Sequence, residues 1–411
     1  MLLANLLRRR CCSSLPLLLG SVVVLWFCSS PHVAATGSKV EHLPGVRPEG
    51  PLPFELETGY IGVGELEDIQ LFYYFVKSES NPNIDPIVLW ISGGPECSSF
   101  VAMTEEFGPL LFDVPKNNWS LPTLSLNPYS WTKVASFIFL DLPVRTGFSY
   151  AKSSKNYTAT DVETSYHAAE FIRKWLEDHF QYQSNAFYVG GDSYSGITVP
   201  MIVQAISYGI DAKFKPLVNL KFDTVFTGKH YYWPDVIGEE NDAKRFRGYN
   251  VHAFDRHLIF KGCGEKWVKC RIPVHYEITV HDTRPYHANL STKGYISLIY
   301  SGNADMFVSS FSTERWTKSL NYSVNDDWRP WLINNRIVGE EGMLDSLVIY
   351  SATFADGIND AKNMVMGGSN LDLAADKAER KQTEGAVESG LNDFWGGRIE
   401  GEDEGLQDEI Y

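Results

Sequence analysis

The sequence predicts an α/β fold with a mostly parallel sheet flanked by helices, because short apolar runs alternate with helical segments. Four apolar runs end at Gly, Pro or Ser-Gly and are typical of buried strands: residues 87–92, 137–142, 186–189 and 297–300. Between the second and third runs, Thr160 and Glu163 form a capping box. The helix that follows presents one apolar face, made of Val162, Tyr166, Ala169, Ile172 and Leu176. A second helix is predicted over 197–208, with Pro200 near its first turn.

The composition is that of a globular protein, with 411 residues of which 44% are hydrophobic and 21% charged. A net charge of −15 excludes nucleic-acid binding through a general basic surface. The chain has no His-Glu-x-x-His segment, and the spacing of Cys263 and Cys270 matches no zinc site. We therefore expect no metal and no cofactor.

The first 35 residues are predicted to be a cleaved secretory signal peptide. Three arginines, Arg8 to Arg10, precede the apolar run 15–27, and small residues at 33–35 offer a cleavage site. The alternative is a membrane anchor, which needs about 20 apolar residues, more than this run provides. We expect an extracellular or vacuolar protein with no stable membrane anchor after cleavage.

Four sequons fit this route as glycosylation sites: Asn118, Asn156, Asn289 and Asn321. After cleavage the chain keeps Cys97, Cys263 and Cys270, enough for one disulfide and one free thiol.

Residues 187–196 indicate a nucleophile at Ser193. A predicted strand runs into Gly-x-Ser and turns at once into a helix, which holds the serine hydroxyl clear of the sheet. A plain loop is the alternative. An oxyanion hole needs two backbone N–H donors, and we expect them from Tyr194, after the nucleophile, and from Gly94, after an earlier strand.

The acid of a triad is expected at Asp305, just after the strand 297–300, although a lone Asp there is also compatible with a plain turn. A general base should follow it. All ten histidines precede Asp305, and the last of them is His287. A rearranged loop that brings His275, His281 or His287 to the serine is the remaining source of a base.

These residues resemble the serine carboxypeptidase family, and its plant carboxypeptidase-like branch in particular. The resemblance covers about 40–339 and rests on segments in family order: 42–45, 52–54, 57–60, 71–75, 92–99, 107–109, 141–143, 147–150, 191–196, 301–308 and 326–331. It implies an α/β-hydrolase fold. It also implies that Ser193 is the nucleophile, Asp305 the orienting acid, and Gly94 and Tyr194 the oxyanion hole. A family disulfide implies that Cys97 pairs with Cys270.

The resemblance implies a small ester or a peptide C-terminus as substrate. In peptidase members, an Asn-Gly pair and two acids bind the terminal carboxylate, and the matching positions are Ser92, Gly93, Glu106 and Asp192. Ser92 replaces the Asn and Asp192 replaces a Glu. The Asp-Ser-Tyr-Ser-Gly segment looks more like the branch that transfers acyl groups from glucose esters. Serine carboxypeptidase and acyltransferase activity through an acyl-Ser193 intermediate therefore both remain open.

Several departures from the family pattern favour an incomplete copy. Glu96 and Arg145 stand where the family has Gly, and 222–267 is too short for the family's helical insertion. Residues 340–411 match nothing in the family and are expected to be a disordered acidic tail, with an exposed helix over 374–388; an acidic interaction tail is the alternative. Since no His follows Asp305, the competing interpretations are a catalytically inactive relative, which would be a binding protein, and a misjoined gene model that does not fold stably.

Overall fold

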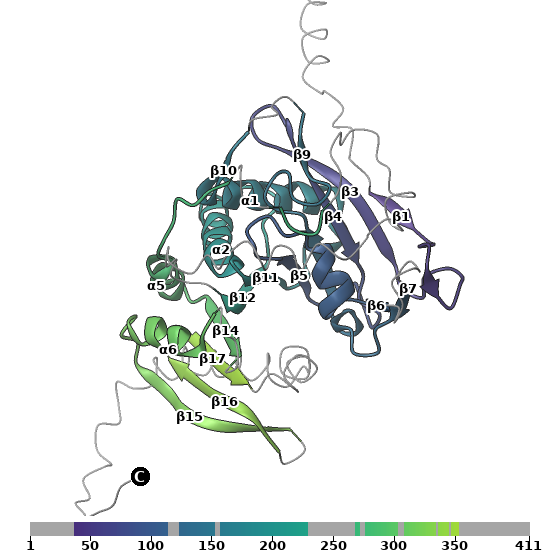
Figure 1. The fold of residues 1–411 in the computed structure, drawn as a ribbon. Coiled ribbons are helices and arrows are strands. Elements are labelled where there is room, and N and C mark those ends of the chain that lie inside the picture. The colour runs from purple at the N-terminus through teal and green to yellow at the C-terminus, as the bar shows by residue number, and fades with distance from the viewer. Residues whose placement is uncertain are drawn as a thin grey trace, which may run out of the picture. The chain divides into compact units, whose positions relative to one another are not determined.

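The structure is a computed structural model that describes residues 37–113, 123–152, 157–228, 268–271, 276–302, 308–333, 336–344 and 347–352. The predicted signal peptide lies outside these residues. The described part is built on a 12-stranded sheet in the order β1-β3-β4-β8-β5-β11-β12-β14-β17-β16-β15, with β9 paired to β4 (Figure 1). Among the helices of the described residues, none is long and apolar enough to cross a membrane.

Six neighbouring strands form the parallel centre of the sheet, from β8 to β17. In sheet order they are β8 (Ser136–Leu140), β5 (Ile87–Ile91), β11 (Phe187–Ser193), β12 (Leu220–Gly228), β14 (Ile296–Gly302) and β17 (Leu347–Ala352). Antiparallel strands extend one end: β1 (Ser38–Val40), β3 (Leu56–Val63), β4 (Ile69–Val76) and β9 (Tyr150–Ala151). At the other end, β15 (Val324–Ile333) and β16 (Arg336–Leu344) are also antiparallel. The fold class predicted from the sequence is thus confirmed, since an α/β-hydrolase sheet is mostly parallel with flanking helices.

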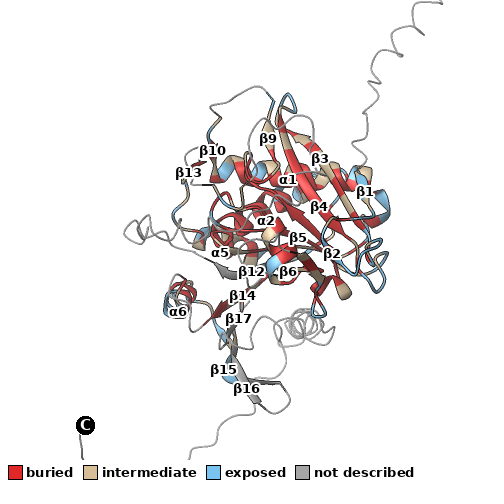
Figure 2. Cartoon of the chain, turned by 45° about the vertical axis from the view of Figure 1, so that its right-hand side comes forward, coloured by how far each residue is buried: buried red, intermediate tan, exposed pale blue. Residues whose placement is uncertain are grey.

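Strands β4, β5 and β8 are buried at nearly every position because both faces of the sheet are covered. In β4, Leu71, Tyr73 and Phe75 belong to one core cluster, and the alternate residues Phe72 and Tyr74 belong to another. The first cluster includes residues of α1 (Asp161–Asp178) and α2 (Ser195–Asp211), and the second includes residues of the segment 100–131. Period-2 alternation between two apolar layers explains the continuous apolar runs of the sequence. Figure 2 shows the burial of the sheet and of these two helices.

The helix α1 begins where the sequence predicts it, but its apolar face is different. The Thr160 hydroxyl accepts a hydrogen bond from the Glu163 N–H at 3.2 Å, which is one half of the predicted capping box. Val162 and Tyr166 are 42% and 56% exposed, so the prediction that they face the core is wrong. The other three predicted residues, Ala169, Ile172 and Leu176, are buried as expected, and Ala168, Phe171 and Trp175 complete the buried face. In α2, Pro200 lies beyond the first turn, inside the helix.

The sheet continues past Gly339, where we expected the body of the protein to end. Strand β16 spans that position, and β17 pairs in parallel with β14 from Ser297↔Leu347 to Gly302↔Ala352. Leu347 and Ile349 are buried in the core. Strand β16 has two antiparallel partners, β15 and β17, and β17 buries an apolar face. These two strands therefore belong to the sheet and not to a tail. Residues 353–411 lie outside the described part.

A buried aspartate holds together three segments that surround the start of α2. Asp161 is fully buried at the first position of α1, where the positive end of the helix dipole favours its charge. One carboxylate oxygen accepts hydrogen bonds from the hydroxyls of Tyr194 and Tyr276, each at 2.7 Å. The other oxygen accepts from the backbone N–H groups of Thr279 (2.6 Å) and Val280 (2.9 Å). Every side of this carboxylate is therefore used, and none of the sequence patterns above singled it out.

We expect Asp161→Ala to lower the free energy of unfolding strongly. The substitution leaves two buried hydroxyls and two backbone N–H groups without their acceptor, at about 1–3 kcal/mol for each group that stays unsatisfied. Urea unfolding followed by tryptophan fluorescence measures the loss. Asp211→Ala is the control, because Asp211 is an exposed acid paired with Lys293 and an exposed pair contributes at most about 1 kcal/mol. Equal unfolding midpoints for the two variants would contradict the role given to Asp161.

Candidate active site

Ser193 lies at the junction of β11 and α2 in a left-handed backbone conformation, with φ of 52°. A non-glycine residue at positive φ is strained, and such residues cluster at functional sites. The turn is tight because its neighbours are small. A Cβ on Gly191 would lie 2.5 Å from the Ile91 carbonyl oxygen, and the Ser195 hydroxyl donates to the same oxygen at 2.8 Å. This is the strand–turn–helix geometry expected around a nucleophile.

The loop after β5 lies directly against this turn. A Cβ on Gly93 would come within 2.6 Å of the Tyr194 nitrogen and 2.8 Å of the Ser193 Cβ, so only glycine fits there. The Gly93 N–H donates to Asp192 Oδ1 at 3.3 Å. The next residue, Gly94, has φ of +115°. The structure thus brings the two sequence-predicted loops together.

A buried network fixes the loop after β5 to the end of β8. The Ser98 hydroxyl donates to Asp141 Oδ1 at 2.6 Å, and the other Asp141 oxygen accepts from the Phe148 N–H at 2.9 Å. The Ser99 hydroxyl donates to the Leu140 carbonyl at 2.7 Å and accepts from the Ser92 N–H at 3.0 Å. Burial raises the pKa of Asp141 to about 7, although the Ser98 hydrogen bond opposes the shift. Asp141 positions the loop, and its sequence signals are an acid inside an apolar run and its place in the family-like segment 141–143.

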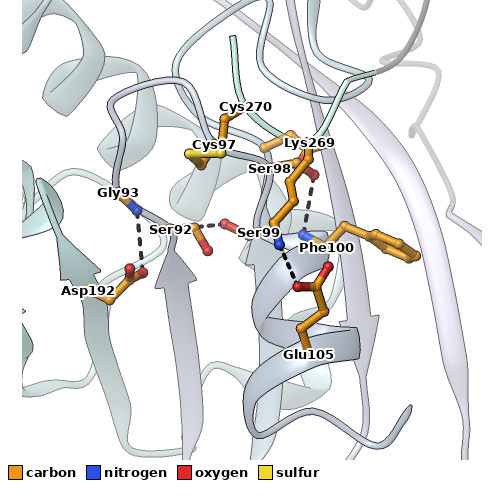
Figure 3. The surroundings of a disulfide bond; sticks show 11 residues. Ser92, Gly93, Cys97, Ser98, Ser99, Phe100, Glu105, Asp192, Lys269 and Cys270 are labelled. Carbon is orange, nitrogen blue, oxygen red and sulfur yellow. Dashed lines mark hydrogen bonds and ion pairs between the residues drawn. A yellow bond between two sulfur atoms is a disulfide. The ribbon is translucent and has the colours of Figure 1, made fainter. Parts of the chain in front are cut away.

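The loop is also crosslinked to a distant segment (Figure 3). Cys97 and Cys270, 173 residues apart in the chain, form a disulfide, which is the pairing that the family resemblance implies. Beside it, the Ser98 N–H donates to the Lys269 carbonyl at 2.9 Å, and the Lys269 ammonium pairs with the Glu105 carboxylate. Cys263 lies outside the described residues. A covalent bond and an ion pair therefore hold residues 268–271 against the loop.

Two carboxyl groups interact electrostatically, and one of them directly precedes Ser193 in the chain. Glu106 ends the π-helical segment Ala102–Glu106, and Asp192 precedes the serine. Burial, followed by repulsion from the Asp192 carboxylate, raises the pKa of Glu106 well above its usual value. Burial also raises the pKa of Asp192, while the Gly93 N–H hydrogen bond opposes the shift. Like charges this close disfavour double ionisation, so the pair holds a proton at mildly acidic pH.

Glu96 and Arg145 both occupy left-handed positions, with φ of 72° and 77°. The glycines that the family has at these places would avoid this strain. Glu96 is only 3% exposed. Burial raises its pKa to about 7, and the positive charges of Arg271 and Arg145 oppose the shift. The two departures from the family pattern therefore bring opposite charges to the same part of the site.

We expected an acid at Asp305 and a histidine base near Ser193. The described part of the structure shows neither of them at the serine. Asp305 lies outside the described residues, three residues beyond the end of β14. His287 is buried on α5 (Arg284–Thr292), where its ring stacks on Trp316 and Nδ1 lies 3.3 Å from the Ser297 hydroxyl. Burial lowers the pKa of His287 to about 4. The His287 ring is thus hydrogen-bonded to Ser297.

The predicted glycosylation sites differ in their surroundings. Asn289 is half-buried on α5, and its amide donates to the Gln204 side chain at 2.6 Å. Asn321 is exposed after α6 (Ser310–Lys318) at φ of 54°. Asn118 and Asn156 lie outside the described residues.

The chain was compared with known proteins. The serine carboxypeptidase family matches residues 44–228 and 252–355, with an interruption inside the range where the sequence predicts a shortened insertion. Serine carboxypeptidase-like 17 of Arabidopsis thaliana is 38% identical over 74% of this chain and 85% of its own length. Serine carboxypeptidase-like 2 of the same plant is 37% identical over 86% of this chain and 93% of its own length. The family match extends past Gly339, in agreement with the position of β16 and β17 in the sheet.

A solved structure supports the fold. The prohormone-processing carboxypeptidase Kex1 from Saccharomyces cerevisiae superposes with a TM-score of 0.58 at 14% identity, covering 79% of this chain and 92% of Kex1. The sheet order, the turn at Ser193 and the matched residues agree with one another. The chain belongs to the serine carboxypeptidase family.

Proposed function

We propose that this chain recognises the carboxylate or ester end of a small acyl compound or peptide. The hydroxyl oxygen of Ser193 would accept the acyl group. The observation that carries the proposal is the strained position of Ser193 between β11 and α2, in contact with the loop that contains Gly93 and Gly94. Peptidases and acyltransferases of this kind share the acyl-serine step and differ in the group that attacks it. The N–H groups of Gly94 and Tyr194 would stabilise the oxyanion that forms.

The carboxyl pair supplies the recognition. A protonated Glu106 donates a hydrogen bond to a substrate carboxylate, whereas an ionised Glu106 repels it. Asp192 is held by the Gly93 N–H, so the pair has a fixed position relative to the turn at Ser193. Ser92, which stands before Gly93, lies on the same loop and is buried. This arrangement supports binding of anionic acyl ends at acidic pH.

Catalytic turnover needs a general base for Ser193, and the residues of the candidate site described above do not supply one. The printed sequence has no histidine after Asp305, and His287 is buried against Trp316. An unactivated serine hydroxyl is a poor nucleophile near neutral pH. This observation favours a second candidate function, a family member that binds acyl ligands without catalysing their hydrolysis.

The proposed location is the secretory route, either outside the cell or in the vacuole. It rests on the arginines and the apolar run that precede residue 35. The disulfide between Cys97 and Cys270 is consistent with an oxidising compartment.

We expect the chain to hydrolyse small esters and C-terminal peptides no faster than its Ser193→Ala variant, because no histidine follows Asp305 in the sequence to act as the general base. Initial rates of both proteins on a p-nitrophenyl ester and a blocked dipeptide measure this. Labelling with a fluorophosphonate probe is the companion assay, since it detects an activated serine independently of substrate choice. A clear excess rate, or Ser193-dependent labelling, would show a base elsewhere in the chain and would establish the enzyme over the binding protein.

We expect binding of a carboxylate ligand to weaken as pH rises through the raised pKa of Glu106, by up to about tenfold per pH unit above it. The protonated acid is the binding form, so affinity is highest on the acidic side. Calorimetric titration with a blocked dipeptide, compared with its C-terminal amide, measures this at several pH values.

The Glu106→Gln variant should lose this pH dependence, because its amide stays neutral. Glu41→Gln is the control, because Glu41 is an exposed acid paired with Lys39, and this variant should keep the dependence of the original chain. A pH profile that is unchanged in Glu106→Gln would remove Glu106 from ligand recognition.

A further inference from the structure

Residues 268–271 are a short segment that is fastened to the loop after β5. The Cys97–Cys270 disulfide links the two covalently, and the two cysteines also face each other in an antiparallel bridge. Two backbone hydrogen bonds, at 2.9 and 3.1 Å, lie on either side of this bridge, and the Lys269 carbonyl accepts the first of them. The backbone of Lys269 therefore has a fixed position on the loop that lies against the turn at Ser193.

The Lys269 side chain extends from this segment to the π-helical segment Ala102–Glu106. Figure 3 shows its ammonium directed at the Glu105 carboxylate, with which it forms an ion pair. The two side chains are only 20% and 32% exposed, so water and salt screen their charges in part. Since Glu105 directly precedes Glu106, the ion pair brings a positive and a negative charge next to one member of the carboxyl pair.

The charged groups that act on Glu106 come from three segments of the chain. Burial raises the pKa of Glu106 most strongly, and the negative charges of Asp192 on β11 and of the neighbouring Glu105 raise it further. Lys269 acts in the opposite direction, because its positive charge stabilises the ionised carboxylate and lowers the pKa. The two members of one ion pair therefore have opposite effects on the protonation of Glu106.

We propose that Lys269 is a positioning residue for ligand recognition: its charge sets the upper limit of the pH range in which Glu106 stays protonated and donates to a ligand carboxylate. The inference rests on the recognition role proposed above for Glu106. Lys269 acts through Glu106 and not by contact with the ligand. The disulfide-linked segment keeps the lysine in place, so its ammonium stays at Glu105 and its effect on Glu106 is constant.

Neutralising each member of the ion pair should shift the protonation of Glu106 in opposite directions. In Lys269→Gln, Glu106 loses a nearby positive charge while Glu105 stays negative, so Glu106 should keep its proton to a pH about one unit higher. In Glu105→Gln, the positive charge of Lys269 is no longer opposed, so Glu106 should lose its proton at a lower pH than in the original chain.

Infrared titration of the full chain measures this proton directly, because a protonated carboxylic acid and a carboxylate absorb at different frequencies. Each protein is recorded with and without an additional Glu106→Gln change, so that the difference separates Glu106 from all other acids. Lys293→Gln is the matched control, since Lys293 is a similarly exposed lysine, at 26%, that pairs with Asp211. Asp211 ends α2, about 25 Å along the helix from the turn at Ser193, so this variant should leave the midpoint unchanged.

Opposite shifts in Lys269→Gln and Glu105→Gln support the proposal. A purely structural role of the ion pair would move the midpoint in the same direction in both variants, because both break the same pair, and that result overturns the proposal. Midpoints that stay at the value of the original chain overturn it as well.

Calorimetric titration with the blocked dipeptide completes the test. At a pH above the midpoint of the original chain, Lys269→Gln should bind the dipeptide up to about tenfold more tightly, since one pH unit is a factor of ten in protonation. Weaker binding, which is expected if the ammonium attracts the anionic ligand directly, overturns the proposal. Failure of the recognition role itself has a different signature, because the original chain and Glu106→Gln would then bind the dipeptide with the same pH dependence.

Discussion

The site depends on the direct contact between the Gly93 backbone and the turn at Ser193. No side chain fits at Gly93, because a Cβ would lie 2.6 Å from the Tyr194 nitrogen. This contact places two parallel strand ends, those of β5 and β11, close enough for one reacting group to meet donors from both. Asp141 holds the first loop and Asp161 holds the second, each through a buried carboxylate with at least two hydrogen bonds. Two buried acids, Asp141 and Asp161, thus maintain the geometry of the candidate active site.

Much of this arrangement was predictable from the sequence, because it follows from local patterns. Apolar runs closed by glycine or proline identified four of the six central strands, β5, β8, β11 and β14, and Gly-x-Ser between strand and helix identified Ser193. Only part of the face of α1 was predictable, since Val162 and Tyr166 keep the helical spacing of the buried Ala169, Ile172 and Leu176 but border a pocket and solvent. The strands beyond Gly339 were missed because β16 carries Gly and Glu residues that have no strand pattern, and its pairing with β15 and β17 decides its structure.

The buried acids were missed for a different reason. Asp141 and Asp161 look like turn and capping residues in the sequence, and only the fold brings their partners to them from up to 119 positions away in the chain. Glu96 and Arg145 could be identified in the sequence as departures from family glycines, and the structure shows the positive φ that makes them costly. That these two residues affect each other electrostatically could be seen only in the structure. Two strained residues of opposite charge at neighbouring loops offset part of each other's burial cost.

The central claim is that the substrate-recognition half of a serine carboxypeptidase site is assembled in this chain, with Glu106 and Asp192 set beside Ser193. A crystal structure with a bound blocked dipeptide at acidic pH tests it most directly. The account predicts that the ligand carboxylate accepts a hydrogen bond from Glu106 while the neighbouring carbonyl carbon lies about 3–3.5 Å from the Ser193 hydroxyl. A ligand whose carboxylate points to solvent, or whose carbonyl lies away from Ser193, would contradict the account.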